Sequence, residues 1–171
     1  ATPNVRVADP QYNAGQIIKS IAEAHARGAK LIVFPELALT AYTCQDLFFQ
    51  QTLLDASQAA LKQILAATAQ QYADTLIFLG LPWVRDSKLY NCAAAIKDGR
   101  LLGIIPKRHI PNYSEFYEAR YFTPGNETPV SIPWENTRIP MGTNLIFNCS
   151  NIPNLLISAE ICEDGWVPCP P

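Results

Sequence analysis

Apolar residues recur at helical spacing near the start of the chain. In residues 13–27, "NAGQIIKSIAEAHAR", apolar side chains repeat every three or four positions, which predicts an amphipathic helix. Asn13 is a suitable residue to cap the start of this helix, and Gly28 is suitable for its end. The β-branched run "KLIVFPE" follows. Because Pro35 stops this run, we expect a short buried strand there.

The pattern alternates between helix and strand along the rest of the chain. Residues 50–73 predict a second helix, and "TLIFLGLP" predicts another buried strand. Asp98-Gly99 joins two apolar runs and predicts a hairpin, because glycine takes the positive φ of a tight turn. Residues 107–136 show little periodicity and predict mostly loop, whereas "TNLIFNC" and "NLLISAEIC" predict two further strands. This order is typical of a mixed α/β fold in which helices cover a sheet.

Composition narrows the classes of protein that fit this pattern. The chain has 171 residues, of which 49% are hydrophobic and 16% charged, and its net charge is −2. These values are typical of a single globular domain. No basic run marks a nucleic-acid partner, and no apolar run approaches the roughly 20 residues that span a bilayer. The amino terminus does not resemble a signal peptide, so we expect a cytoplasmic protein.

Five irregularly spaced cysteines argue against both a disulfide framework and a zinc site. Their number is odd, no CxxC pair occurs, and the two histidines lie far from any cysteine pair. A reducing compartment fits this usage best. We therefore expect no metal or other cofactor in this domain.

Three predicted strands end on residues that can do chemistry. "LIVFPE" ends at Glu36, "LLGIIPK" at Lys107 and "NLLISAEIC" at Cys162. Ligands gather beyond strand ends in α/β sheets, so the three side chains could share one pocket. A thiol nucleophile, a carboxylate that takes its proton and an ammonium that holds an oxyanion suffice to attack an amide carbonyl. Taken singly, each residue also has an ordinary structural explanation, such as a buried thiol or a solvated charge.

Three separated segments resemble the signature motifs of a known superfamily. "VFPELALTAY", "PKRHIPNYSEFYEARYFTPG" and "ICEDGW" are similar to those of the nitrilase, or carbon–nitrogen hydrolase, superfamily. The last two segments further resemble the glutamine amidohydrolase domain of glutamine-dependent NAD synthetases. The resemblance implies an α/β fold, the nitrilase-type α-β-β-α sandwich of four layers, present here as a partial domain. We expect residues 1–171 to be one glutaminase domain truncated at both ends, with the synthetase domain outside this chain.

The resemblance also implies a role for each matching residue. Glu36 is the general base, Lys107 stabilises the oxyanion and Cys162 is the nucleophile that forms a thioester with glutamine. The resemblance implies that Glu118 is a supporting carboxylate that orders the lysine. It also implies that Tyr113 and Glu163 shape the glutamine pocket.

Cofactors and partners follow from the same resemblance. It implies no cofactor for the glutaminase domain, and ATP and Mg for the absent synthetase domain, which would amidate deamido-NAD with the ammonia. The implied partners are glutamine, the synthetase domain of the same polypeptide and further copies of the chain in a homo-oligomer. One position departs from the family, which usually has glycine where Ala41 stands. The extra methyl group would crowd the turn if φ is positive there.

Two other functions remain open at this point. A free-standing amidase or nitrilase would carry the same three residues, and a synthetase domain downstream would separate it from the first hypothesis. A non-catalytic regulatory domain of the same fold is the second alternative. Ordinary explanations of the supporting residues also stay open: a salt bridge from Glu118 to Arg120 or another neighbour, packing for Tyr113 and a solvated carboxylate for Glu163.

Overall fold

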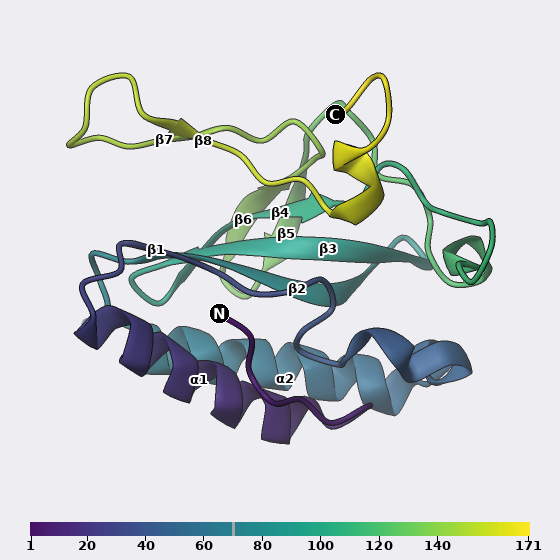
Figure 1. Cartoon of the computed structure of the whole chain (residues 1–171), viewed down its shortest axis with the longest axis horizontal. Coiled ribbons are helices and arrows are strands. Elements are labelled where there is room, and N and C mark those ends of the chain that lie inside the picture. The colour runs from purple at the N-terminus through teal and green to yellow at the C-terminus, as the bar shows by residue number, and fades with distance from the viewer. Residues whose placement is uncertain (70) are drawn as a thin grey trace.

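The computed structural model describes residues 1–69 and 71–171. A six-stranded sheet carries two long helices on one face and a C-terminal segment on the other (Figure 1). The helices are α1 (Pro10–Ala26) and α2 (Gln51–Thr68), and three 3-10 turns are η1 (Tyr42–Phe49), η2 (Glu118–Arg120) and η3 (Cys162–Gly165). The strands are β1 (Leu31–Val33), β2 (Leu76–Arg85), β3 (Lys88–Lys97), β4 (Arg100–Pro106), β5 (Val130–Trp134), β6 (Thr137–Met141), β7 (Phe147–Asn148) and β8 (Leu156–Ile157).

The sheet has the order β1-β2-β3-β4-β6-β5. Strands β2, β3 and β4 form an antiparallel meander, β1 lies parallel to β2, and β6 lies parallel to β4. The predicted hairpin is confirmed, since Asp98 and Gly99 take φ values of 50° and 66° between β3 and β4. A second tight turn at Asp86 and Ser87, both with positive φ, joins β2 to β3. The fold is therefore the predicted mixed α/β arrangement, and the described residues build one helical layer and the sheet it covers.

Both faces of the sheet are apolar, which explains why its central strands read as continuous hydrophobic runs. Alternate residues of β2, including Ile77 and Leu79, pack with the helices in the main core. Phe78 belongs to a second cluster on the opposite face, where Ile105 and Ile161 contribute. β1 differs because it lies at the sheet edge, so the prediction of a buried strand there was wrong. Two of its three residues, the first and the last, are exposed.

Helix α1 begins earlier than its hydrophobic pattern suggests. Asp9, rather than Asn13, caps it by accepting a hydrogen bond from the Tyr12 N–H at 3.0 Å. Asn13 lies buried within the helix and donates to the Leu39 carbonyl oxygen at 3.1 Å, which ties α1 to the segment after β1. Gly28 ends the helix as predicted, with a φ of 83°.

Three other predictions need correction. The second helix ends at Thr68; the prediction continued to residue 73, and Gln70 within it lies outside the described residues. Most of residues 107–136 is loop, as predicted, but the segment also contains η2 and β5, which the pattern did not indicate. Pro133 argues against a strand in the sequence, but β5 is an edge strand, where the missing N–H of proline is tolerated. The strand predicted to reach Cys162 was also wrong, since β8 ends at Ile157 and Cys162 opens η3.

No helix in the described part of the chain has the length and apolar character needed to cross a membrane.

Candidate active site

Glu36 is held by a turn that lies directly on β2. The Phe34 N–H bonds to the Phe78 carbonyl oxygen at 2.9 Å, and the Leu39 N–H bonds to the Gly80 carbonyl oxygen at 3.1 Å. A Cβ atom at Gly80 would come within 2.3 Å of a backbone oxygen of this turn. Because only glycine permits so close an approach, Gly80 allows the turn that carries Glu36 to lie directly against β2.

Lys107 follows β4 directly and is fully buried. Its backbone N–H donates to the Asn91 carbonyl oxygen at 2.7 Å, and its own carbonyl accepts from the Gly125 N–H at 2.8 Å. Its Nζ donates to Glu36 Oε1 at 2.7 Å and to the two Glu118 oxygens at 2.9 and 3.0 Å. Burial alone would lower the pKa of Lys107, but the two carboxylates outweigh it and raise the pKa above its ordinary value. The site therefore holds a permanent ammonium between two carboxylates.

Glu118 supports this ammonium from the turn η2. Its side chain is buried and also accepts a hydrogen bond from the Tyr42 hydroxyl at 2.7 Å. Burial, and next the contact with Glu118, raise the pKa of Tyr42 well above its ordinary value. The alternative salt bridge from Glu118 to Arg120 does not form, because Arg120 pairs with both Asp46 oxygens at 2.7 and 2.8 Å.

Cys162 begins the turn η3, on the face of the sheet opposite to the helices (Figure 1). Asp164 of that turn is buried and accepts backbone N–H bonds from His109 at 2.7 Å and from Arg108 at 3.2 Å. These bonds attach η3 to the residues that immediately follow Lys107. Cys162 has a φ of 49°, an unusual value for a residue with a side chain.

One cavity joins Cys162 to the carboxylate of the first motif. Cys162 and Glu36 both line it, together with Phe78, Gly80 and Ala93, and its volume is about 290 Å³. Burial raises the pKa of the Cys162 thiol, the Glu36 charge raises it further, and the Lys107 charge opposes them. Glu36, Lys107 and Glu118 are therefore joined by hydrogen bonds, and Cys162 lies close enough for their charges to affect its pKa.

Tyr113 and Glu163 contact each other, and they line a different cavity from the one that Cys162 and Glu36 share. The Tyr113 hydroxyl donates to Glu163 Oε2 at 2.8 Å, and both residues line an open cavity of about 530 Å³ that includes His109. Tyr113 is 56% exposed, so packing does not explain its position. The hydrogen bond to Glu163 raises the pKa of Tyr113.

Two polar residues of the site escaped the sequence analysis. Tyr42 stands in the quoted segment "LTAY", but nothing in its spacing shows that it reaches Glu118. Asn91 donates its side-chain N–H to Glu36 Oε1 at 2.6 Å. Its only signal in the sequence is a polar residue at the start of the apolar run "NCAAAI".

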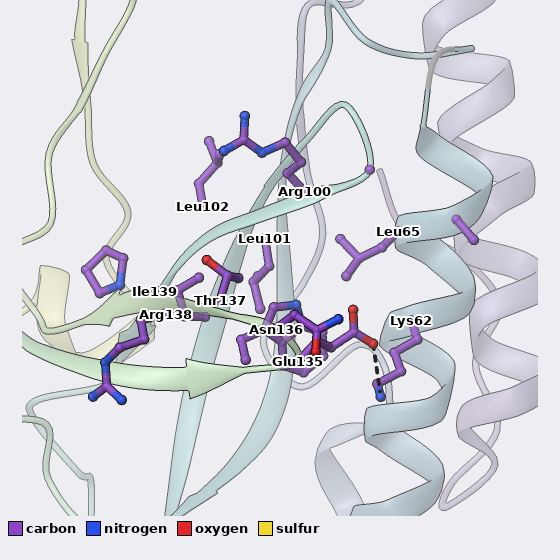
Figure 2. Close-up of a pocket in the computed structure, with 14 residues that line it drawn as sticks. Lys62, Leu65, Arg100, Leu101, Leu102, Glu135, Asn136, Thr137, Arg138 and Ile139 are labelled. Carbon is purple, nitrogen blue, oxygen red and sulfur yellow. Dashed lines mark ion pairs between the residues drawn. The ribbon is translucent and has the colours of Figure 1, made fainter.

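A larger cavity of about 640 Å³ lies away from these residues, between α2, β4 and the β5–β6 turn. Figure 2 shows that Lys62 of α2 points toward Glu135, with which it forms an ion pair at 3.1 Å, whereas Arg138 points away from the other labelled residues. No cysteine lines this cavity. Among residues 1–69 and 71–171, no group of three or more histidine, cysteine or acidic side chains is placed to hold a metal ion.

A buried ammonium, two carboxylates and a thiol beside one α/β sheet define a site suited to amide hydrolysis. Sequence comparison agrees: the chain belongs to the carbon–nitrogen hydrolase family, whose model matches residues 1–169. Its relatives include glutamine-dependent NAD(+) synthetases. The protein from Mycobacterium tuberculosis is 36% identical over 170 residues, and that from Aquifex aeolicus is 34% identical over 165 residues. These alignments cover 99% and 96% of this chain, which spans 25% of the length of each relative.

Solved structures of related proteins have a similar fold. The crystal structure of a glutamine-dependent NAD(+) synthetase from Cytophaga hutchinsonii matches with a TM-score of 0.80 and 25% identity, over 87% of this chain and 25% of that one. An amidase from Nesterenkonia matches with a TM-score of 0.61 and 22% identity, over 81% of this chain and 53% of that one. The second similarity concerns the fold alone. The predicted nitrilase-type fold is therefore confirmed.

Proposed function

We propose that this chain is the glutaminase part of a glutamine-dependent NAD synthetase and releases ammonia from the side-chain amide of glutamine. The observation that carries the proposal is the buried Lys107 ammonium held between Glu36 and Glu118 beside Cys162. The relatives named as glutamine-dependent NAD(+) synthetases support the choice of glutamine.

The first chemical step couples proton transfer to nucleophilic attack. The raised pKa of Cys162 keeps the resting group a thiol at neutral pH. Glu36 takes the thiol proton as the sulfur bonds to the amide carbon, and the carbonyl π electrons move to the oxygen. Lys107 remains charged and donates hydrogen bonds toward this oxyanion.

Collapse of the tetrahedral intermediate breaks the carbon–nitrogen bond. Glu36 returns its proton to the departing nitrogen, ammonia leaves and a γ-glutamyl thioester to Cys162 remains. Water then attacks the thioester while Glu36 takes its proton, and return of that proton to sulfur yields glutamate and the free thiol. Glu118 holds Lys107 in place throughout, and Tyr113 with Glu163 would line the part of the pocket that receives the rest of glutamine.

The remainder of the proposal concerns the whole polypeptide. The ammonia would pass to a synthetase domain that amidates deamido-NAD, with ATP and Mg²⁺ bound in that domain rather than here. We further propose a cytoplasmic, homo-oligomeric enzyme. The hydrolytic steps above use only side chains of this chain.

The test compares two nitrogen sources in the full-length protein. Cys162→Ala should abolish NAD synthesis from glutamine and leave synthesis from added ammonia within about twofold, because only the glutaminase step needs the thiol. Cys169→Ala is the matched control, since that cysteine is also exposed and lies near the same terminus. Equal loss with glutamine and with ammonia would show that Cys162 is structural and would refute the proposal.

A further inference from the structure

Asn91 occupies an unusual position for an amide side chain. It lies near the start of β3 and is fully buried. Strand alternation places it on the same face as Ala93 and Ala95, which pack in the apolar cluster opposite the helices. Burying an amide in such a row costs free energy unless its polar atoms are bonded. The contacts of Asn91 should therefore explain its presence.

The side chain of Asn91 bonds to Glu36. Its Nδ2 donates to Glu36 Oε1 at 2.6 Å, and the same oxygen accepts from Lys107 Nζ at 2.7 Å. Its Oδ1 is buried and has no hydrogen-bond partner among the described residues. The opposite amide orientation would place Oδ1 against a carboxylate oxygen, so the N–H must face Glu36. The Asn91 amide therefore donates a hydrogen bond to Glu36, while its own Oδ1 stays without a partner among the described residues.

The main chain of Asn91 also holds Lys107, the ammonium that contacts Glu36. Its carbonyl oxygen accepts the Lys107 N–H at 2.7 Å. One residue of β3 therefore fixes the carboxylate that follows β1 and the backbone of the lysine that follows β4. These two residues are 71 positions apart in the sequence.

The two donors, Asn91 and Lys107, make the two carboxylate oxygens of Glu36 different from each other. Oε1 accepts from both Asn91 and Lys107 and is therefore the poorer site for a proton. Oε2 remains for proton exchange. Fixing one oxygen also fixes the direction of the other, because the carboxylate is planar.

We propose that Asn91 is a positioning residue that commits Glu36 Oε1 to the buried cluster and directs Oε2 to the proton of Cys162. The inference rests on the proposed glutaminase function. Asn91 acts through Glu36 and does not itself touch the substrate. The other charged or titratable groups around Glu36 are Lys107 in direct contact, Glu118 on the same ammonium, and Cys162 and Tyr42, whose pKa values the Glu36 charge raises.

Two variants in the full-length protein test the inference. Asn91→Ser shortens the side chain by one bond and so withdraws the donor from Glu36. It should lower kcat for glutamine hydrolysis about 10- to 100-fold with a smaller change in KM, since misplacement of a catalytic group by about 1 Å costs that much. Asn91→Asp keeps the shape but sets a second carboxylate against Glu36. Two carboxylates in contact raise a shared pKa. The acidic limb of the kcat/KM profile should therefore move to higher pH by about one unit or more.

The controls separate positioning from general damage. Synthesis from added ammonia should stay within about twofold of wild type in both variants. Thr68→Val removes a buried hydrogen bond, from Thr68 Oγ1 to the Leu65 carbonyl oxygen at 3.0 Å, at the far end of α2. It should leave the pH profile unchanged. Thermal unfolding shows whether each variant is folded, and if Asn91→Asp is not, the kcat and KM of Asn91→Ser decide.

The possible results have distinct meanings. A shifted acidic limb in Asn91→Asp, with selective loss of glutamine activity in Asn91→Ser, supports the inference. Wild-type kinetics in Asn91→Ser would overturn it, as would a folded Asn91→Asp that loses activity equally at every pH. Full glutamine-dependent synthesis in Cys162→Ala would instead refute the proposed function itself, so the two failures are distinguishable.

Discussion

Replacing the buried ammonium is the most direct test of how the cluster is held together. Lys107→Met keeps most of the side-chain volume but removes the charge from a fully buried position. Glu118, whose side chain is 5% exposed, would retain the hydrogen bond from Tyr42 and lose its cation. Glu36 would retain Asn91. Two carboxylates would then face each other across an apolar methionine.

The structure sets the size of the effect. One oxygen of Glu36 and one of Glu118 contact the same Lys107 nitrogen, so these two oxygens lie within about 6 Å of each other. Unit charges at that distance repel by about 3 kcal/mol at an effective dielectric constant of about 20. Breaking a buried ion pair on one side costs about 3–5 kcal/mol. The variant should relieve this penalty by protonating Glu118, so its folded pKa should rise above the unfolded value of about 4.3. A carboxyl shifted upward destabilises the fold at neutral pH, and the penalty shrinks as the pH falls.

Amide hydrogen exchange of the full-length protein, read by mass spectrometry on peptides from β3 and β4, measures the opening of this sheet. At pH 7.5 the Lys107→Met variant should lose roughly two to four orders of magnitude of protection, and the loss should shrink clearly at pH 5. Lys97→Met is the matched control. That lysine lies on β3, is exposed and donates one hydrogen bond to the Ala73 carbonyl oxygen, so its removal should cost about 1 kcal/mol or less. Equal losses at both pH values, or a loss no larger than the control's, would show that an unpaired buried carboxylate does not destabilise the variant.

Three further changes test the surroundings of the site. Gly80→Ala should lower kcat/KM for glutamine about 100-fold with ammonia-dependent synthesis retained, because its methyl group must displace the turn that carries Glu36. Ala41→Gly should raise stability by about 1 kcal/mol in thermal unfolding, since φ 66° and ψ 155° suit glycine alone, and an unchanged or lower midpoint would contradict this. Alkylation of Cys162 by iodoacetamide should still accelerate above pH 8.5 because its pKa is raised, so a plateau near neutral pH would contradict the assigned environment.

Local patterns were sufficient for the elements whose burial matches their periodicity. The helix pattern found both long helices, and the apolar runs found the central strands. Asp98-Gly99 placed the hairpin at its correct position because glycine chemistry decides such turns locally. The motifs indicate Glu36, Lys107, Glu118 and Cys162 without any knowledge of the tertiary structure. Whether these residues have their expected catalytic roles stays a prediction.

Other features depended on neighbours that periodicity cannot see. β5 escaped notice because its proline is acceptable only at a sheet edge, and β1 is exposed because it lies at the opposite edge. The run that ends at Cys162 reads as a continuous strand, yet Asp164 binds the backbone beyond Lys107 and helps turn the chain into η3. The family pattern left the sign of φ at Ala41 open, and the structure gives 66°.

The residue types available for chemistry can be read from the sequence, and so can most short helical and strand segments, because the choice between helix and strand depends on side chains within a few positions. Which of these residues meet depends on how the strands pack side by side. Contact between Glu36 and Lys107 spans 71 positions and requires β1, β2, β3 and β4 to lie side by side. The contribution of Asn91 is visible only in that arrangement, because a hydrogen bond across 55 positions leaves no periodic trace in the chain.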